Sequence, residues 1–323
     1  MKAFITGGAG FIGSSMAGRL LLGAHNTVTV FDNFSSGHHH FLPPDTAGGR
    51  LRVVTGDLLD FRAVLEAIAG HDVVFHFASN PDIARGMTDT SLDLNQSIVA
   101  TYNLLESMRV CDVKHIVFPS GSGVYGDTAG LATAEDFGPL LPISMYGAGK
   151  LGAEALISAY CHMFDMRCHI LRLANVVGRN QTHGVALDFM RKLWQQPDRL
   201  TILGDGHQSK SYIHVEDVLD AIFFLDAMCD EQINLYNVAT EDTVEVQWIA
   251  DTVAEAMGLS GVAYEYTGGP RGWPGDVPVV HLDVGKILKL GWRPRMNSQE
   301  ALRLSITQLL ERLRNESRSE AGR

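Results

Sequence analysis

Two residues four positions apart form the pair in this sequence best suited to acid–base chemistry. Tyr146 and Lys150 occur in the run YGAGK, and positions i and i+4 share one face of a helix. An ammonium near a phenol favours the phenolate, because it stabilises the negative charge. Lowering a phenol pKa by about 3 units requires roughly 4 kcal/mol, which two positive charges in a dry cleft can supply. The spacing therefore predicts a tyrosine base assisted by a lysine.

A serine-rich turn lies upstream of this pair. Ser120 and Ser122 flank Gly121 in the run SGSGVYG, which directly follows an apolar stretch at 115–118. Hydroxyls at this point can relay a proton between a substrate and Tyr146. The alternative interpretation is a turn that only ends a strand.

A glycine triplet near the N-terminus has the spacing of a nucleotide-binding turn. Gly7, Gly10 and Gly13 follow a short apolar stretch and precede an amphipathic helix that includes Phe11 and Ile12. In a strand–turn–helix unit, these glycines allow a tight turn, the approach of a pyrophosphate, and close packing of helix on strand. The N-terminus of the helix then offers free N–H groups to the phosphates.

Asp32 narrows the choice of nucleotide. It ends a second apolar stretch at 27–31, about 20 residues after the glycines, where an acid binds the ribose hydroxyls of a dinucleotide. Its charge repels a 2′-phosphate, and no arginine follows it directly. The sequence therefore predicts NAD, and not NADP, as cofactor.

Strands and helices alternate through the first half of the chain. Apolar runs and helical periodicity predict strands at 2–6, 27–31, 51–55, 72–77, 115–118 and 167–173 and helices after the glycine turn and at 61–69, 90–109 and 145–164. Repeated β-α units predict an α/β fold, a Rossmann-type doubly wound parallel sheet with ligands at the carboxyl ends of its strands.

The pattern changes after residue 174. We expect residues 1–174 to form the NAD-binding domain and residues 175–323 to form mainly a smaller α/β substrate lobe, with some segments returning to the large domain. In this second half, the patterns predict helices at 184–195, 215–228 and 246–257 and strands at 200–203 and 235–238. Irregular segments are expected as a surface loop at 35–50, a Gly/Pro-rich loop at 267–278 and a frayed polar tail from Asn315.

Composition restricts the class of protein. The 323 residues carry a net charge of −11 without runs of like charge, which disfavours a nucleic-acid surface. No apolar run of about 18 residues predicts a membrane span, and the N-terminus lacks the apolar core of a signal peptide. The four cysteines include no CxxC pair, and the three adjacent histidines at 38–40 have no cysteine or acid pair to complete a metal site. We therefore expect a cytoplasmic enzyme without a metal.

Together, the glycine triplet, Asp32, the VYG segment and the Tyr146–Lys150 pair resemble the extended short-chain dehydrogenase/reductase family, in particular its NAD-dependent nucleotide-sugar epimerases. The resemblance extends to about Trp292. It implies that Tyr146 is the base, that Lys150 binds the nicotinamide ribose, and that a serine or threonine contacts the sugar O4.

The hydroxyl position is where this chain departs from the family. Counted back from Val124, the usual serine or threonine position falls on Gly121. Our hypothesis is that Ser122 makes the contact with the sugar, with Ser120 as the second choice.

The resemblance also assigns binding residues one by one. To the cofactor it assigns Gly7, Gly10, Phe11, Ile12, Gly13, Asp32, Asn33, Asp57, Leu58, Phe77, Ala78, Ser79 and Asn95, besides Tyr146 and Lys150. To the sugar nucleotide it assigns Ser122, Tyr146, Asn175, Val185, Arg191, Lys210 and Arg271. Lys210 stands where the family commonly has an arginine, so the bidentate contact of an arginine with phosphate is lost.

The implied reaction is epimerisation of a UDP-sugar at C4 through a 4-keto intermediate. We expect UDP-glucose and UDP-galactose as substrates, with UDP-glucuronate as the alternative, because Arg191 and His183 could meet a C6 carboxylate. The family's decarboxylases and 4,6-dehydratases carry acids just before Val-Tyr-Gly, where this chain has Ser122 and Gly123.

A protein of another class remains as a further alternative. Some members of this fold bind NAD(P) without catalysis and act as regulators, typically after losing the tyrosine or the lysine, and this chain has both. Enzymes of the family often pair through two long helices, here near 90–109 and 145–164. The resemblance therefore implies a homodimer that binds a UDP-sugar and neither nucleic acid nor a membrane.

Overall fold

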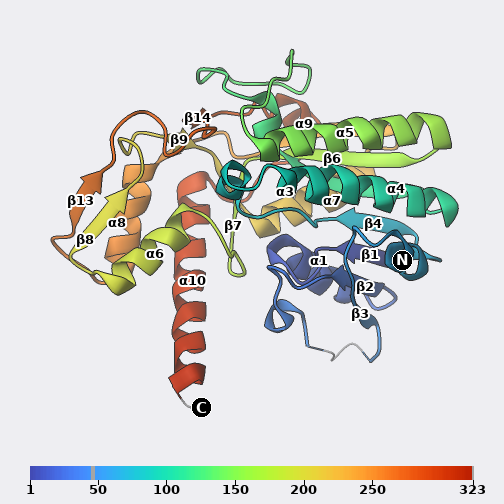
Figure 1. Cartoon of the computed structure of the whole chain (residues 1–323), viewed down its shortest axis with the longest axis horizontal. Helices are drawn as coiled ribbons and strands as arrows, with labels where there is room; N and C mark the ends of the chain where they lie inside the picture. Colours follow the sequence, from blue (N-terminus) through green and yellow to red (C-terminus); the bar gives the residue numbers. More distant parts are fainter. Residues whose placement is uncertain (45–47, 322–323) are drawn as a thin grey trace.

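The centre of the fold is a seven-stranded parallel sheet (Figure 1). The computed structural model describes residues 1–44 and 48–321, with side chains as far as Glu316, and its strand order is β11-β6-β5-β4-β1-β2-β3. The strands are β1 (Lys2–Thr6), β2 (Thr27–Asp32), β3 (Leu51–Thr55), β4 (Val73–His76), β5 (His115–Gly121), β6 (Arg167–Leu173) and β11 (Ile233–Val238). Strand order reverses at β1, as in a doubly wound sheet. The expected α/β Rossmann-type fold is confirmed.

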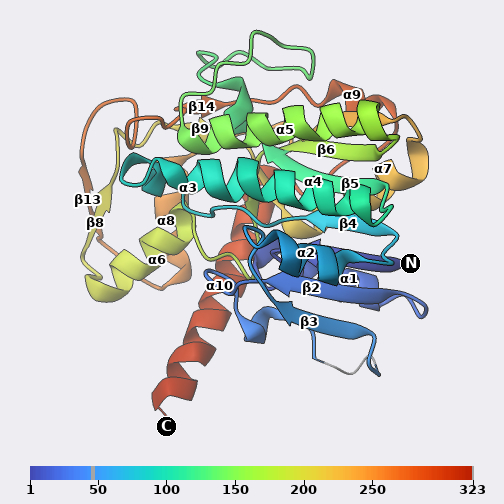
Figure 2. The same cartoon turned by 45° about the vertical axis from the view of Figure 1, so that its right-hand side comes forward.

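Both faces of the sheet are covered, because apolar side chains alternate between them with a period of two residues. In β1, Ala3 and Ile5 belong to one apolar cluster and Phe4 to the other, and all three are fully buried. The Ala3 side is covered by α1 (Phe11–Leu21) and α7 (Val215–Met228). The Phe4 side is covered by α2 (Phe61–Ile68), α4 (Ala100–Val110) and α5 (Met145–Phe164). Figure 2 shows α4 and α5 running side by side over the sheet.

The helix expected at 90–109 is interrupted. It consists of α3 (Ser91–Asp93), a π-helical turn over Leu94–Val99, and then α4. This turn lies against α5 at Gly149, where an added Cβ would come 2.9 Å from the Ser97 Cβ. A π turn adds a residue to the helical repeat, so a strict 3.6-residue period misplaces the side chains of this segment.

The second half of the chain builds a smaller lobe beside the carboxyl ends of the strands (Figure 1). Its core lies between α6 (Val185–Gln195), α8 (Val246–Ala256), α10 (Ser298–Ala321) and a pair formed by β8 (Arg199–Ile202) and β13 (Ala263–Tyr266). Two small sheets join the halves: β7 (Asn175–Val177) with β10 (Tyr212–His214), and β9 (Ser209–Lys210) between β12 (Val244–Glu245) and β14 (Val279–Val280). β11 comes from this half but pairs with β6 in the large sheet.

Irregular segments differ from expectation in two places. The tail from Asn315 is not frayed, because α10 continues to Ala321 and is docked by Arg312, whose Nη2 donates to the Gln181 carbonyl at 3.0 Å. The loop expected at 35–50 contains a short 3₁₀ turn, and its residues 45–47 lie outside the described part of the chain. The remaining short helices are η1 (His39–Phe41), η2 (Ile83–Met87), η4 (Ser122–Tyr125) and α9 (Gly285–Lys289).

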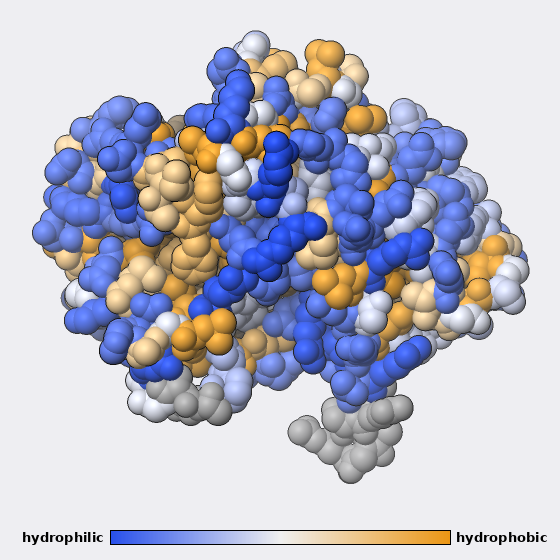
Figure 3. Space-filling model, turned by 180° about the vertical axis from the view of Figure 1, so that it is seen from behind, coloured by the Kyte–Doolittle hydropathy of each residue, from blue (hydrophilic) through white to orange (hydrophobic). Residues whose placement is uncertain are grey.

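The exterior fits a chain whose apolar residues are gathered inside. Seen from behind, the surface is mostly hydrophilic, with hydrophobic residues in separate patches (Figure 3). Among the described helices, none combines the length and the apolar character needed to cross a bilayer.

A buried ion pair ties α5 to β6. Arg172 donates from Nε and Nη2 to the two carboxylate oxygens of Glu154, at 3.1 and 2.8 Å, and both side chains are less than 9% exposed. The guanidinium also lies over the Tyr125 ring, 4.8 Å from its centroid, and donates to the Glu135 carbonyl. A bidentate pair of this kind leaves little of either charge unsatisfied.

Removing one partner of this pair is expected to be costly, because the other charge stays buried. We expect Glu154→Gln to lower the free energy of unfolding by about 3–5 kcal/mol, as measured by urea denaturation. The exposed pair of Lys192 and Asp188, 2.7 Å apart, is the matched control, and Asp188→Asn should cost less than about 1 kcal/mol. Similar losses for both variants would contradict this view of the buried pair.

Candidate functional site

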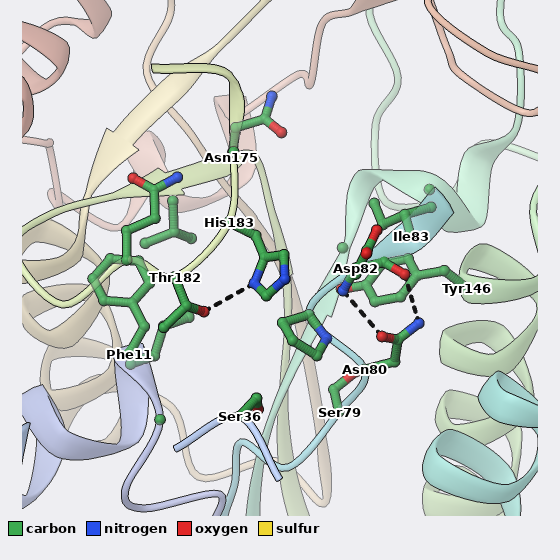
Figure 4. A pocket seen from close by; sticks show the side chains of 18 of the residues that line it. Phe11, Ser36, Ser79, Asn80, Asp82, Ile83, Tyr146, Asn175, Thr182 and His183 are labelled. Carbon is green, nitrogen blue, oxygen red and sulfur yellow. Dashed lines mark hydrogen bonds between the residues drawn. The ribbon is translucent and has the colours of Figure 1, made fainter. Parts of the chain in front are cut away.

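A cavity of about 850 Å³ lies at the carboxyl ends of the strands, between the large sheet and the smaller lobe. The glycine turn, the ends of β2, β4 and β5, and the start of α5 form one side of it, and residues of the smaller lobe form the other. Figure 4 shows Ser79, Asn80 and Tyr146 on one side and Thr182, from the segment after β7, on the other. The two halves of the chain therefore share one site.

The glycine turn is shaped to receive a phosphate group. Gly7 has φ +63°, and a Cβ there would lie 2.6 Å from the Ala78 backbone nitrogen, so a side chain is excluded. Gly10 is the N-cap of α1, with no side-chain cap and no acid in the first turn. The first amides of α1 are thus left for a ligand, as a pyrophosphate requires.

The acid at the end of β2 is buried and oriented. Asp32 is 7% exposed, and its two carboxylate oxygens accept from the backbone N–H groups of Ala9 and Phe34, both at 2.8 Å. Next to it, Asn33 donates to the Asp57 carboxylate at 2.9 Å. These residues line one end of the cavity, together with Leu58, Phe77, Ala78 and Ser79. The structure therefore brings most of the expected cofactor residues into one cavity.

Tyr146 and Lys150 lie on the first turns of α5, whose start is capped by Ser144 accepting from the Gly147 N–H at 3.1 Å. Lys150 is 4% exposed. Its Nζ donates to the Pro119 carbonyl at 3.0 Å and lies 5.7 Å from the centroid of the Tyr146 ring. The i, i+4 spacing thus places both groups in the cavity, with the ammonium directed toward the end of β5.

Without a ligand, the surroundings of Tyr146 raise the pKa of its phenol. Burial raises the pKa of Tyr146 to about 12, and the Asp93 carboxylate adds to this effect. Burial also lowers the pKa of Lys150 to about 8, against the carboxylates of Glu154 and Asp93, which raise it. Desolvation thus disfavours both charged forms in the ligand-free cavity.

Three serines line the same cavity as the phenol: Ser79, Ser120 and Ser122. The Ser120 and Ser79 hydroxyls are buried and, among the described residues, make no hydrogen bond of ordinary geometry. The Ser79 hydroxyl lowers the pKa of Tyr146, although the opposing effect of burial is larger. Ser122 begins the turn η4 and also lines the cavity. Ser79, which the sequence assigned to the cofactor alone, thus becomes a further candidate for contact with the phenol.

Gly121 leaves a space in front of the phenol. A Cβ there would lie 3.9 Å from the Tyr146 hydroxyl, an ordinary contact distance. A longer side chain at this position would therefore reach the phenol, and its absence leaves that contact to another group.

The substrate end of the cavity is lined by Asn175, Val185, Arg191 and Lys210. Lys210 Nζ lies 2.6 Å from the Asp276 carboxylate and 5.7 Å from the centroid of the Trp273 ring. The cation is therefore already paired with an acid.

Two predicted residues do not line the cavity. Arg271 instead pairs with the Asp127 carboxylate and donates to the Asp276 carbonyl. Asn95 lies in the π turn, which places its neighbour Gln96 on the cavity wall. Arg271 is held away from the cavity by contacts with distant segments, and Asn95 is displaced by the local change of helical repeat.

Asp93 is a functional candidate that the sequence did not indicate. It is fully buried; one carboxylate oxygen accepts from the Asn80 side chain at 3.1 Å, and the other has no partner among the described residues. It acts electrostatically on both Tyr146 and Lys150. The sequence signal that could have identified Asp93 is the presence of an acid at a helix position expected to be buried.

Comparison with known proteins agrees with this geometry. Residues 3–239 match the sequence model of a family described as the NAD dependent epimerase/dehydratase family. The chain is 31% identical over 323 residues to a UDP-glucose 4-epimerase of Mycolicibacterium smegmatis, covering 98% of this chain and 100% of the relative.

Solved structures are similar over nearly the whole chain. A crystal structure of a UDP-galactose 4-epimerase has a TM-score of 0.86 and 38% identity, over 97% of this chain and 100% of that chain. MoeE5 in complex with UDP-glucuronic acid and NAD has a TM-score of 0.84 and 29% identity, with the same coverage of 97% and 100%.

The charge of Lys150 leads to a prediction about NAD binding. Because its pKa is about 8 in the protein without nucleotide, the ammonium is present below that pH and lost above it. We expect the affinity of nucleotide-stripped protein for NAD to fall as the pH rises through about 8. Fluorescence titration should show weaker binding and no such transition for Lys150→Met; a transition that persists in this variant would contradict the prediction.

Proposed function

Because this chain belongs to the NAD dependent epimerase/dehydratase family, we propose that it interconverts UDP-glucose and UDP-galactose by epimerisation at C4. More broadly, it is an NAD-dependent isomerase of the UDP-sugar 4-epimerase kind. The observation that carries the proposal is that Tyr146 and Lys150 share a cavity with the glycine turn and Asp32.

The cofactor of the chain is NAD, and the residues of the cavity fit it. The uncapped N-terminus of α1 would receive the pyrophosphate, and Asp32 would accept from the hydroxyls of the adenosine ribose. When bound, NAD supplies the reversible hydride acceptor that oxidation at C4 needs. Lys150 would donate to the nicotinamide ribose instead of the Pro119 carbonyl.

The reaction requires one group that takes and returns a proton. Tyr146, as phenolate, would accept the proton of the O4 hydroxyl during oxidation at C4, for which bound NAD would supply the hydride acceptor. The 4-keto sugar would then present the opposite face of C4 for reduction within the same cavity. Tyr146 then gives the proton back to O4. Atoms and electrons balance over the cycle, so no external oxidant is consumed.

The hydroxyl contact can be assigned by mutation. We expect Ser79→Ala to reduce kcat by about 100-fold, the lower range for a lost proton-transfer group, because the Ser79 hydroxyl is the one that affects the Tyr146 pKa. Ser120→Ala and Ser122→Ala are the matched variants, compared by steady-state kinetics. A larger loss for Ser122→Ala would instead support the hypothesis drawn from the family pattern, and no loss in any variant would assign the contact to water or Tyr146 alone.

UDP-glucuronate, which carries a carboxylate at C6, is the second candidate substrate, and one observation favours it. Arg191 lines the cavity from α6, with His183 on the preceding loop, so a cation could meet a uronate. Ser122 and Gly123, just before Val124, supply no carboxyl group for dehydration or decarboxylation. The hexose remains the first choice because the relatives named above for it are 31% and 38% identical to this chain, against 29% for MoeE5.

Substrate assays separate these candidates. We expect turnover of UDP-glucose to UDP-galactose, followed by chromatography of the C4 epimers with NAD supplied, at a kcat/KM at least tenfold above that for UDP-glucuronate. Arg191→Ala should leave the hexose reaction within about twofold. Preferred turnover of UDP-glucuronate, lost selectively in Arg191→Ala, would promote the second candidate. Absence of turnover with both substrates would favour a regulator that binds NAD without catalysis.

We also propose that this protein is a homodimer and that it is located in the cytoplasm. The helices expected to pair in a homodimer, α4 and α5, expose Tyr102 and Met163, which are 48% and 72% exposed. The four cysteines are all unpaired, as is usual for proteins of the reducing cytoplasm.

A further inference from the structure

A cluster of two histidines and an acid lies at the edge of the sheet opposite the cavity. His115 begins β5, His169 lies in β6, and Asp226 lies in the last turn of α7. His115 is the register partner of Arg167, and His169 follows Arg167 by two residues, so all three side chains leave the sheet on one face. Figure 2 shows α7 beside β6 at this end, away from the smaller lobe.

The three groups are spaced like the ligands of a small metal ion. Asp226 Oδ1 lies 3.6 Å from His115 Nε2 and 3.6 Å from His169 Nε2. The three ligand atoms all lie within 4.8 Å of one another. Tetrahedral coordination with bonds of about 2.0–2.1 Å places neighbouring ligand atoms about 3.3 Å apart. Small side-chain shifts would therefore bring the three onto one ion.

Three of the four ring nitrogens of these histidines make no hydrogen bond among the described residues. His169 is 1% exposed, and neither ring nitrogen makes a hydrogen bond among the described residues; His115 Nε2 also lacks one. Burying an imidazole without partners is unfavourable.

Arg167 occupies part of this cluster. Its Nη2 donates to His115 Nδ1 and to Asp226 Oδ1, both at 3.2 Å. Since Nδ1 then accepts, the proton of the neutral His115 ring must lie on Nε2, the nitrogen that faces the acid. A metal on Nε2 requires the other tautomer and the departure of the guanidinium. The Arg167 side chain is 36% exposed, so it can extend into solvent.

We propose that His115, His169 and Asp226 form a binding site for a divalent transition metal ion of the Zn²⁺ class, and that Arg167 competes with this ion. Two imidazoles and a carboxylate match the ligands that Zn²⁺ and Co²⁺ accept, with water in the fourth position. The ion would link β5, β6 and α7 at the amino edge of the sheet. Its role is stabilisation of the fold, and it takes no part in chemistry at the cavity.

Co²⁺ titration tests the site, because its visible ligand-field bands report coordination directly. All proteins in this test should carry His39→Gln and His40→Gln, which remove exposed histidines outside the cluster. The protein called native here has no substitution in the cluster itself. We expect the native cluster to bind Co²⁺. We also expect that Zn²⁺ raises the midpoint of thermal unfolding. Arg167→Gln should bind Co²⁺ at least tenfold more tightly, because the glutamine oxygen can accept from His115 Nδ1–H, and outer partners of a ligand typically change affinity about 10–100-fold.

The variants of the acid complete the test. Asp226→Asn should abolish the bands, whereas Asp112→Asn, at an acid whose side chain is 84% exposed near the same edge, should leave them unchanged. Far-UV circular dichroism confirms folding of each variant. Bands that persist in Asp226→Asn would overturn the proposal. So would the absence of binding by the native cluster at millimolar Co²⁺, whether or not Arg167→Gln binds.

Discussion

The desolvation of Tyr146 and Lys150 governs the chemistry of the cavity. Burial moves the pKa of both groups toward their neutral forms, to about 12 for the phenol and about 8 for the amine. The protein by itself therefore disfavours the phenolate. A positive charge brought into the same dry space by a bound dinucleotide would act in the opposite direction. In the function proposed above, formation of the base would thus be coupled to occupancy by the cofactor.

The glycines between these two residues allow close packing of α5 against its neighbours. An added Cβ at Gly147 would come 2.5 Å from the Gly123 carbonyl oxygen, and one at Gly149 would meet Ser97 in the π turn. α5 therefore touches the serine-rich turn and the π turn with its backbone. The buried pair of Glu154 and Arg172 joins the same helix to β6. The run YGAGK thus encodes both the reacting groups and the contacts that position them.

Local patterns predicted much of this structure, and long-range contacts account for the remainder. Alternating and continuous apolar runs identified all six strands of the first half, because residues such as Ala3 and Phe4 face separate cores of one sheet. The spacing of Tyr146 and Lys150 reflects one turn of helix, and that of the glycines reflects one strand–turn–helix unit; both are local enough to be recognised from the sequence. The direction of Arg271 could not be predicted, since it depends on Asp127, 144 positions away in sequence. The π turn at Asn95 depends on the glycine face of α5, and the electrostatic effect of Asp93 depends on its burial beneath that helix.

The cation that lines the substrate end, Lys210, is held by an acid of this same chain, Asp276. In the function proposed above, a diphosphate arriving here would exchange one anionic partner for another, so part of its attraction to the cation would be cancelled by the separation of the existing pair. The same acid would recapture the cation when the ligand leaves, which would lower the barrier to its departure. Such an exchange would favour release of substrate and product alike, since the two isomers differ only in one stereocentre.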